Sequence, residues 1–141
     1  MKNDYYDIAC NDLLYLQATL HLPFYNSIAP AAQQVAEKMI KSVAELTCMG
    51  IEKLMQSHNL RALYDEIHQV EPSFTLGRSS LAMLKDFYFE ARYPGDNFIT
   101  VTKEDCAECL ETMYQVVEEV NRFRKDHDLP VMEIQRIDLQ S

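Results

Sequence analysis

Turn-forming residues are scarce in this chain, which has only 3 Gly and 5 Pro among its 141 residues, and Trp is absent. Few turn formers in a chain of this length indicate few turns and therefore long secondary-structure elements. A sandwich of many short strands needs frequent turn signals, so the composition argues against that class. The composition favours an all-α fold instead.

Positive charge is also scarce, because 13 Lys and Arg stand against 22 Asp and Glu, which gives a formal net charge of −9. A uniformly basic face is therefore not expected, which disfavours RNA as a partner but is compatible with a small local basic cluster. Neither a signal peptide nor a transmembrane stretch is recognisable, so we expect a cytoplasmic protein without membrane contact. In that reducing compartment the four cysteines are expected to be thiols.

The length fits one domain, and the 48% hydrophobic and 25% charged residues are ordinary values for a globular chain. We expect a helical bundle over residues 1–126 and a C-terminal tail over residues 127–141. Apolar and polar residues partly alternate in the tail, but the phase of the alternation slips. The tail is therefore expected to be either an extended arm on a partner or a loosely packed end.

Apolar residues recur at spacings of three and four along most of the chain, as in helices with one buried face. Pro30 suits the first turn of a helix, Gly50 suits a helix end, and Thr102 suits a helix start. Residues 92–97 form the clearest loop, since a proline and a glycine stand together there among polar residues. The sequence thus predicts an up-and-down bundle of about five helices, over about residues 3–20, 27–49, 57–70, 76–91 and 102–126.

Four segments of the chain carry recognisable motifs in order. The two most specific read Ala-Gln-Gln-Val-Ala-Glu-Lys-Met-Ile-Lys over residues 32–41 and Tyr-Phe-Glu-Ala-Arg-Tyr-Pro-Gly over residues 88–95. The others are an opening helix that contains Tyr6 and Asp12, and the segment His58-Asn59-Leu60. Together they resemble the HEPN domain family, the "higher eukaryotes and prokaryotes nucleotide-binding" domains.

The resemblance implies a four-helix bundle with one additional short helix, which pairs as a homodimer. It also implies an ancestry among nucleotide- or RNA-associated proteins. Many family members are encoded beside a minimal nucleotidyltransferase, often as toxin–antitoxin pairs, so such an enzyme is an implied partner. We expect the present chain to keep the fold and the pairing.

Some members of this family are metal-independent ribonucleases that use an Arg-x(4–6)-His motif near the start of the last helix. In this sequence no His follows Arg92 at that spacing. Arg61 and His68 have the spacing, but they lie on the third predicted helix, and we interpret this match as coincidence. The departure weakens the ribonuclease hypothesis and favours a binding function.

One polar side of the second predicted helix holds the first group of candidate site residues. It is formed by Gln33, Gln34, Glu37, Lys38 and Lys41. This side is a solvated face, a polar strip that fixes helix register, or a groove in which Lys38 or Lys41 meets a phosphate and the glutamines read a base. Glu37 and Lys41 are four residues apart, so they can also form an ion pair on the helix surface.

Arg92 and Tyr93 end the fourth predicted helix and form the second group. Arg92 can donate to the last carbonyls of its own helix, pair with Glu37, or bind a phosphate through its planar guanidinium. Tyr93 can offer a stacking face, and His58 can cap the third helix or line a polar cleft. The candidate ligand-binding residues are therefore Gln34, Lys38, Lys41, His58, Arg92 and Tyr93.

Cys106 and Cys109 form a Cys-x-x-Cys on the last predicted helix, where they share a face. A zinc site would need two more ligands, and no other Cys or His has matching spacing. A thioredoxin-like motif would need a βαβ context. We expect both thiols to pack in the core, and we expect no metal, no cofactor and no assignable catalytic residue.

Three functions stay open. The preferred hypothesis is a non-catalytic HEPN homodimer that binds a nucleotide or a protein partner such as a minimal nucleotidyltransferase. The second is an RNA-cleaving toxin component of a toxin–antitoxin pair, with the same fold and an altered active site. The third is a dimerisation module without a ligand.

Overall fold

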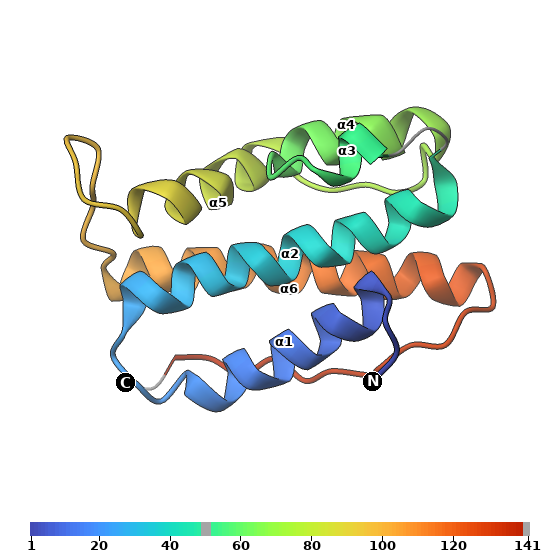
Figure 1. The fold of residues 1–141 in the computed structure, drawn as a ribbon. Helices are drawn as coiled ribbons and strands as arrows, with labels where there is room; N and C mark the ends of the chain where they lie inside the picture. The colour runs from blue at the N-terminus through green and yellow to red at the C-terminus, as the bar shows by residue number, and fades with distance from the viewer. Residues whose placement is uncertain (49–51, 140–141) are drawn as a thin grey trace.

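The computed structural model describes residues 1–48 and 52–139, which form six helices and contain no strand (Figure 1). The predicted all-α bundle is confirmed. Beyond the five predicted helices, the described residues contain α3, a single turn before α4. The helices are α1 (Tyr5–Thr19), α2 (Tyr25–Thr47), α3 (Glu52–Met55), α4 (Leu60–Val70), α5 (Arg78–Glu90) and α6 (Lys103–Asp126).

The central helix is α2, because it contacts α1, α4, α5 and α6. Figure 1 shows α1 on one side of the α2–α6 pair and both α4 and α5 on the other. The core lies where these helices meet. Small buried residues on α2, such as Ala29, Ala32 and Ala36, let the neighbouring helices approach it closely.

Local side-chain chemistry sets three of the helix starts. Asp4 accepts a hydrogen bond from the Asp7 N–H at the start of α1, and Asn59 caps α4 in the same way. Thr102 and Asp105 form a capping box at the start of α6, in which each side chain accepts from the other residue's N–H. The prediction that Thr102 begins the last helix is confirmed.

The second helix starts two residues earlier than predicted. α2 begins at Tyr25, so Pro30 lies inside the helix rather than in its first turn. This earlier start is stabilised by tertiary contacts, because the Asn26 side chain bonds to the loop that follows α5. The predicted helix end at Gly50 lies outside the described residues.

The Cys-x-x-Cys pair of α6 is fully buried, with Cys106 and Cys109 both 0% exposed. Burial raises the pKa of both thiols to about 12, so they are protonated at neutral pH. The predicted core packing is confirmed. Over the described ranges no three His, Cys, Asp or Glu side chains are grouped so that they could hold a metal ion, and no helix there is long and apolar enough to cross a membrane.

The C-terminal tail runs back along its own bundle, without regular secondary structure, beside α1 and α6 (Figure 1). Met132, Ile134 and Leu139 pack against the core. Backbone groups of Met132 and Ile137 also bond to side chains of the bundle. The tail is extended, and it packs on its own chain because its apolar side chains lie in a groove there.

Candidate functional site

The polar side of α2 is largely buried, which excludes one of the three alternatives, a solvated face. Gln33 is 0% exposed, and Glu37 and Lys41 are 4% exposed. Glu37 Oε2 accepts a hydrogen bond from Lys41 Nζ at 3.1 Å, and Glu37 Oε1 accepts one from Gln33 Nε2 at 3.2 Å. The predicted Glu37–Lys41 pair is present, but inside the protein, and this burial removes Lys41 as a free contact for phosphate.

His58 joins the segment before α4 to this buried carboxylate. Its Nδ1 lies 2.9 Å from Glu37 Oε1, while 51% of its side chain is exposed. The imidazole also stacks on Tyr88 of α5, with ring centroids 5.9 Å apart. Asn59, and not His58, caps α4. His58 instead lies between Glu37 of α2 and Tyr88 of α5.

Arg92 lies just beyond α5 and is exposed. Its guanidinium lies 4.6 Å from the centroid of the Tyr88 ring and 5.3 Å from that of Tyr93, both within the range of cation–π attraction. Among the described residues it has no ion pair with a carboxylate. The suggested pairing of Arg92 with Glu37 is wrong, because Lys41 and His58 occupy that carboxylate.

The loop that carries Arg92 is fixed at both ends by Asn26, a residue that the sequence analysis did not select. Asn26 Nδ2 donates to the carbonyl oxygens of Ala91 and Ile99 at 3.0 and 2.9 Å, and its Oδ1 accepts from the Val101 N–H at 2.8 Å. The sequence gives no local signal for this role, since the bonded residues lie 65 or more positions away.

A groove of about 570 Å³ lies between the first turns of α2 and the end of α5. Gln34 and Tyr88 line it, and Arg92 stands at its end with Tyr93 beside it. The Gln34 amide donates to Gln33 Oε1 at 2.8 Å. The groove is lined by Asn26, Ser27, Pro30, Ala31, Gln34, Tyr88, Ala91 and Arg92.

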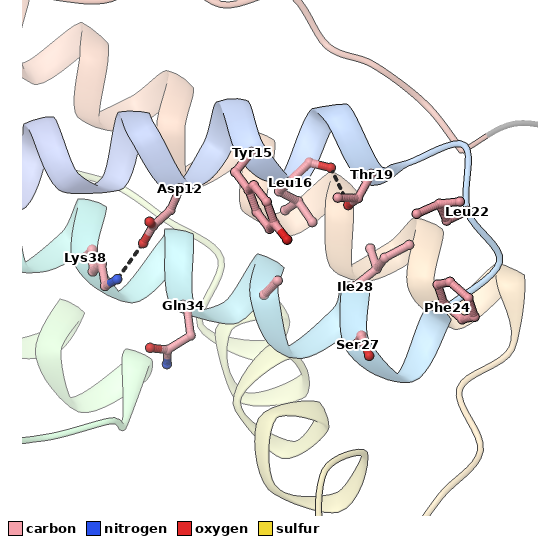
Figure 2. A pocket seen from close by; sticks show the side chains of 11 residues that line it. Asp12, Tyr15, Leu16, Thr19, Leu22, Phe24, Ser27, Ile28, Gln34 and Lys38 are labelled. Atoms are coloured by element: carbon pink, nitrogen blue, oxygen red, sulfur yellow. Dashed lines mark hydrogen bonds and ion pairs between the residues drawn. The ribbon is translucent and has the colours of Figure 1, made fainter.

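A second groove, of about 430 Å³, lies between α2 and α1 and shares Ser27, Ala31 and Gln34 with the first. Figure 2 shows Tyr15, Leu22 and Phe24 along this groove and Lys38 pointing toward Asp12. Lys38 Nζ donates to Asp12 Oδ2 at 2.5 Å, so its charge is compensated. The candidate residue Lys38 is thereby separated from Arg92 and belongs to the more apolar groove.

Two Arg–His pairs have the ribonuclease spacing, and in both the histidine contacts a backbone carbonyl oxygen. His68 Nδ1 lies 2.8 Å from the Phe74 carbonyl oxygen. The other pair, Arg122 with His127, lies at the end of α6 instead of its start. Arg122 pairs with Glu119 and Asp126, and His127 Nδ1 lies 2.9 Å from the Phe123 carbonyl oxygen. Neither pair lines the groove between α2 and α5.

A model of the HEPN domain matches residues 3–123. The chain belongs to the HEPN domain family. No curated protein and no solved structure is similar enough to be matched. The resemblance inferred from the sequence motifs is confirmed.

Three of the four HEPN motif segments meet at one place in the fold. Glu37 comes from the segment on α2, His58 from the segment before α4, and Tyr88 and Arg92 from the end of α5. Contacts link these side chains in series from the buried Glu37 to the exposed Arg92. The HEPN motifs therefore supply a buried ionic network and, at its outer end, a cation at a groove.

Proposed function

We propose that this HEPN domain is a non-catalytic binding protein that holds the phosphate of a nucleotide in the groove between α2 and α5. The observation that carries the proposal is the exposed guanidinium of Arg92, which has no carboxylate partner among the described residues of an acidic chain. A planar guanidinium matches the oxygens of a phosphate and binds two of them at once.

The start of α2 supports the same ligand. Its N-cap residue, Phe24, provides no side-chain hydrogen bond, and the first turn contains no acidic residue. The positive end of the helix dipole therefore lies close to Asn26 and Ser27, which line the groove. A phosphate between this helix start and Arg92 would be attracted by both.

The aromatic rings beside Arg92 suit a nucleobase. Tyr93 is 54% exposed and offers one face for stacking, while the amide of Gln34 can donate to and accept from a base edge. The formal charge of −9 disfavours a long nucleic acid, whose many phosphates would be repelled by the rest of the surface. A mononucleotide, with its few charges, fits the local cation better.

The proposal retains the homodimer and the protein partner that the family membership suggests. A minimal nucleotidyltransferase binds nucleotides itself, so a nucleotide-binding HEPN partner would respond to the same ligand. In that setting the chain would act in the cytoplasm as the non-catalytic component of a toxin–antitoxin pair. Co-purification of the two proteins with and without nucleotide tests this association.

Thermal shift with nucleoside mono-, di- and triphosphates tests the nucleotide site. A ligand at about 100 times its Kd stabilises the fold by about 2.7 kcal/mol, which corresponds to a rise in Tm of several degrees. We expect Arg92→Ala to abolish this rise and Arg92→Lys to keep part of it. Arg61→Ala is the matched control, because Arg61 is an exposed arginine on α4 outside the groove.

Pyrophosphate separates the two halves of the proposed site. Tyr93→Ala is expected to weaken nucleotide binding but to leave pyrophosphate binding unchanged, because stacking requires a base. An equal rise in Tm for the wild-type chain and Arg92→Ala, or no rise with any nucleotide, would refute the site.

RNA cleavage is the second candidate function, and the Glu37–His58 contact favours it. A carboxylate that accepts from Nδ1–H holds an imidazole so that Nε2 is free to take a proton. His58 is half exposed and contacts Tyr88, on which Arg92 also stacks. Cleavage of RNA by the purified chain, lost in both His58→Ala and Arg92→Ala, would replace the non-catalytic proposal.

A further inference from the structure

The tail of this chain is bound through its backbone by side chains of α1 and α6. At Met132, the N–H donates to the Tyr6 hydroxyl at 2.9 Å, and the carbonyl accepts from Asn121 Nδ2 at 3.1 Å. At Ile137, the Tyr114 hydroxyl accepts from the N–H at 3.0 Å and donates to the carbonyl at 2.8 Å. Both polar backbone groups of two residues are thus satisfied by the groove, which fixes the register of an extended peptide.

Charges add a third fixed point between these two residues. Arg136 Nε and Nη2 donate to the two carboxylate oxygens of Glu118, both at 2.8 Å, and Nη1 donates to Glu111. These bonds hold the pKa of Glu118 below its ordinary value. The bidentate geometry makes the groove selective for arginine at this position.

None of these contacts depends on the tail belonging to the same chain. The covalent connection is a tight turn after α6, in which the Leu129 N–H donates to the Arg124 carbonyl at 2.8 Å and the Asp128 N–H to the Lys125 carbonyl at 3.2 Å. Asp128 has φ of 57°, and no other described non-glycine residue has a positive φ. Glycine is the usual residue at this position of a helix C-terminus, so the closed turn is strained.

We propose that the groove between α1 and α6 also accepts the tail of a second copy of this chain, so that two copies exchange residues 130–139. A second copy carries the same Met132, Arg136 and Ile137, and so reproduces every contact of the resident tail. Opening the turn relieves the left-handed conformation of Asp128, and short strained hinges favour such exchange. In the wild-type chain the closed form predominates, since a tail on a short connection has a high effective concentration.

Two substitutions at Asp128 shift this equilibrium in opposite directions. Asp128→Pro forbids a positive φ and removes the N–H that bonds to Lys125, so the closed turn cannot form and the exchanged dimer is expected to predominate. Asp128→Gly removes the strain and is expected to keep each tail on its own chain. Helix content by circular dichroism checks that both variants fold; should Asp128→Pro fail to fold, deletion of Asp128 shortens the turn with the same expected result.

The ion pair between Lys125 of α6 and Glu133 of the tail provides the readout. Lys125 Nζ lies 2.8 Å from Glu133 Oε1, so a carbodiimide joins them as an amide. Equal amounts of ¹⁴N- and ¹⁵N-labelled chains are unfolded, mixed, refolded and cross-linked, and the linked peptides are weighed. In Asp128→Pro we expect Lys125–Glu133 products with mixed labels in the proportion that random pairing gives. In Asp128→Gly we expect products of one label only.

This readout identifies tail exchange even where the chains also pair through another face, because it reports which chain supplies the tail. Mixed-label products in Asp128→Pro, reduced by Arg136→Glu in the same background, establish the exchange. Unmixed products, or a tail that is free and unlinked in every refolded chain, overturn it.

Discussion

The two sides of α2 place neighbouring charged residues in opposite environments. Glu37 pairs with Lys41 where both side chains are 5% exposed, whereas Lys38 pairs with Asp12 where the side chains are 28% and 32% exposed. The first pair is buried between His58, which contacts Glu37, and the ring of Tyr5 on α1, whose centroid lies 5.9 Å from Lys41 Nζ. The second pair lies in the open groove between α1 and α2. Ion pairs of similar composition, one residue apart on a helix, therefore differ in what each contributes to the fold.

The same contrast separates the two grooves. On the α1 side the cation Lys38 is compensated and the groove walls are mainly apolar, with Tyr15 and Phe24 exposed. On the α5 side the cation Arg92 lacks a carboxylate partner among the described residues, and the walls include Asn26. An anion is expected to bind where a positive charge has no partner. The proposed phosphate site therefore lies on the α5 side of α2.

The strongest test of the contrast is Glu37→Ala compared with Lys38→Ala. Removing Glu37 leaves Lys41 buried without a partner, which is expected to cost about 3–5 kcal/mol and to lower Tm by on the order of 10 °C. Lys38→Ala removes a partly exposed pair and is expected to cost less than about 1 kcal/mol. Urea unfolding followed by circular dichroism measures both, and similar losses would show that burial does not distinguish the pairs.

His58→Ala is expected to have an intermediate effect. It removes one hydrogen bond to the buried Glu37 carboxylate and the stacking contact with Tyr88, which together are worth about 1–2 kcal/mol given that half of the imidazole is exposed. In the Glu37→Ala background the same substitution should cost much less, because its partner is already gone. Equal costs in both backgrounds would contradict the network, and unfolding curves of the two variants decide this.

The smallest effect is expected from the coupling between Asp12 and Lys38. A double-mutant cycle with Asp12→Ala and Lys38→Ala is expected to give an interaction energy below about 1 kcal/mol. This interaction energy is expected to decrease further at high salt, because salt screens the two charges. A larger, salt-independent coupling would mean that the α1 groove is closed to water in solution. That result would remove the difference on which the assignment of the two grooves rests.

Much of the fold follows from local sequence patterns. The periodicity of apolar residues predicted the five long helices, and Thr102 with Asp105 marked the start of the last one. The start of α2 was predicted too late, because the contacts of Asn26 that stabilise its first turn come from the loop after α5. The place of the tail stayed open for the same reason, since the groove that receives it combines α1 with α6.

The candidate site was predicted only in part. The motifs indicated His58 and Arg92, and both contact Tyr88 of α5. Lys38 lies in the other groove, and Lys41 is buried in an ion pair rather than free. A helical period of 3.6 residues indicates which residues share a face, but it does not indicate which neighbouring helix covers that face.

By itself, the sequence determined the class of the fold, the family, the start of α6 and the burial of the Cys106–Cys109 face, because each depends on residues close together in the chain. Only the tertiary structure decided the pairings between residues distant in sequence. Glu37 contacts His58, Asp12 pairs with Lys38, and Arg92 is left without a described carboxylate partner. Those pairings depend on the packing of helices distant in sequence, and charge attraction acts over a few ångströms of space rather than over positions in the chain.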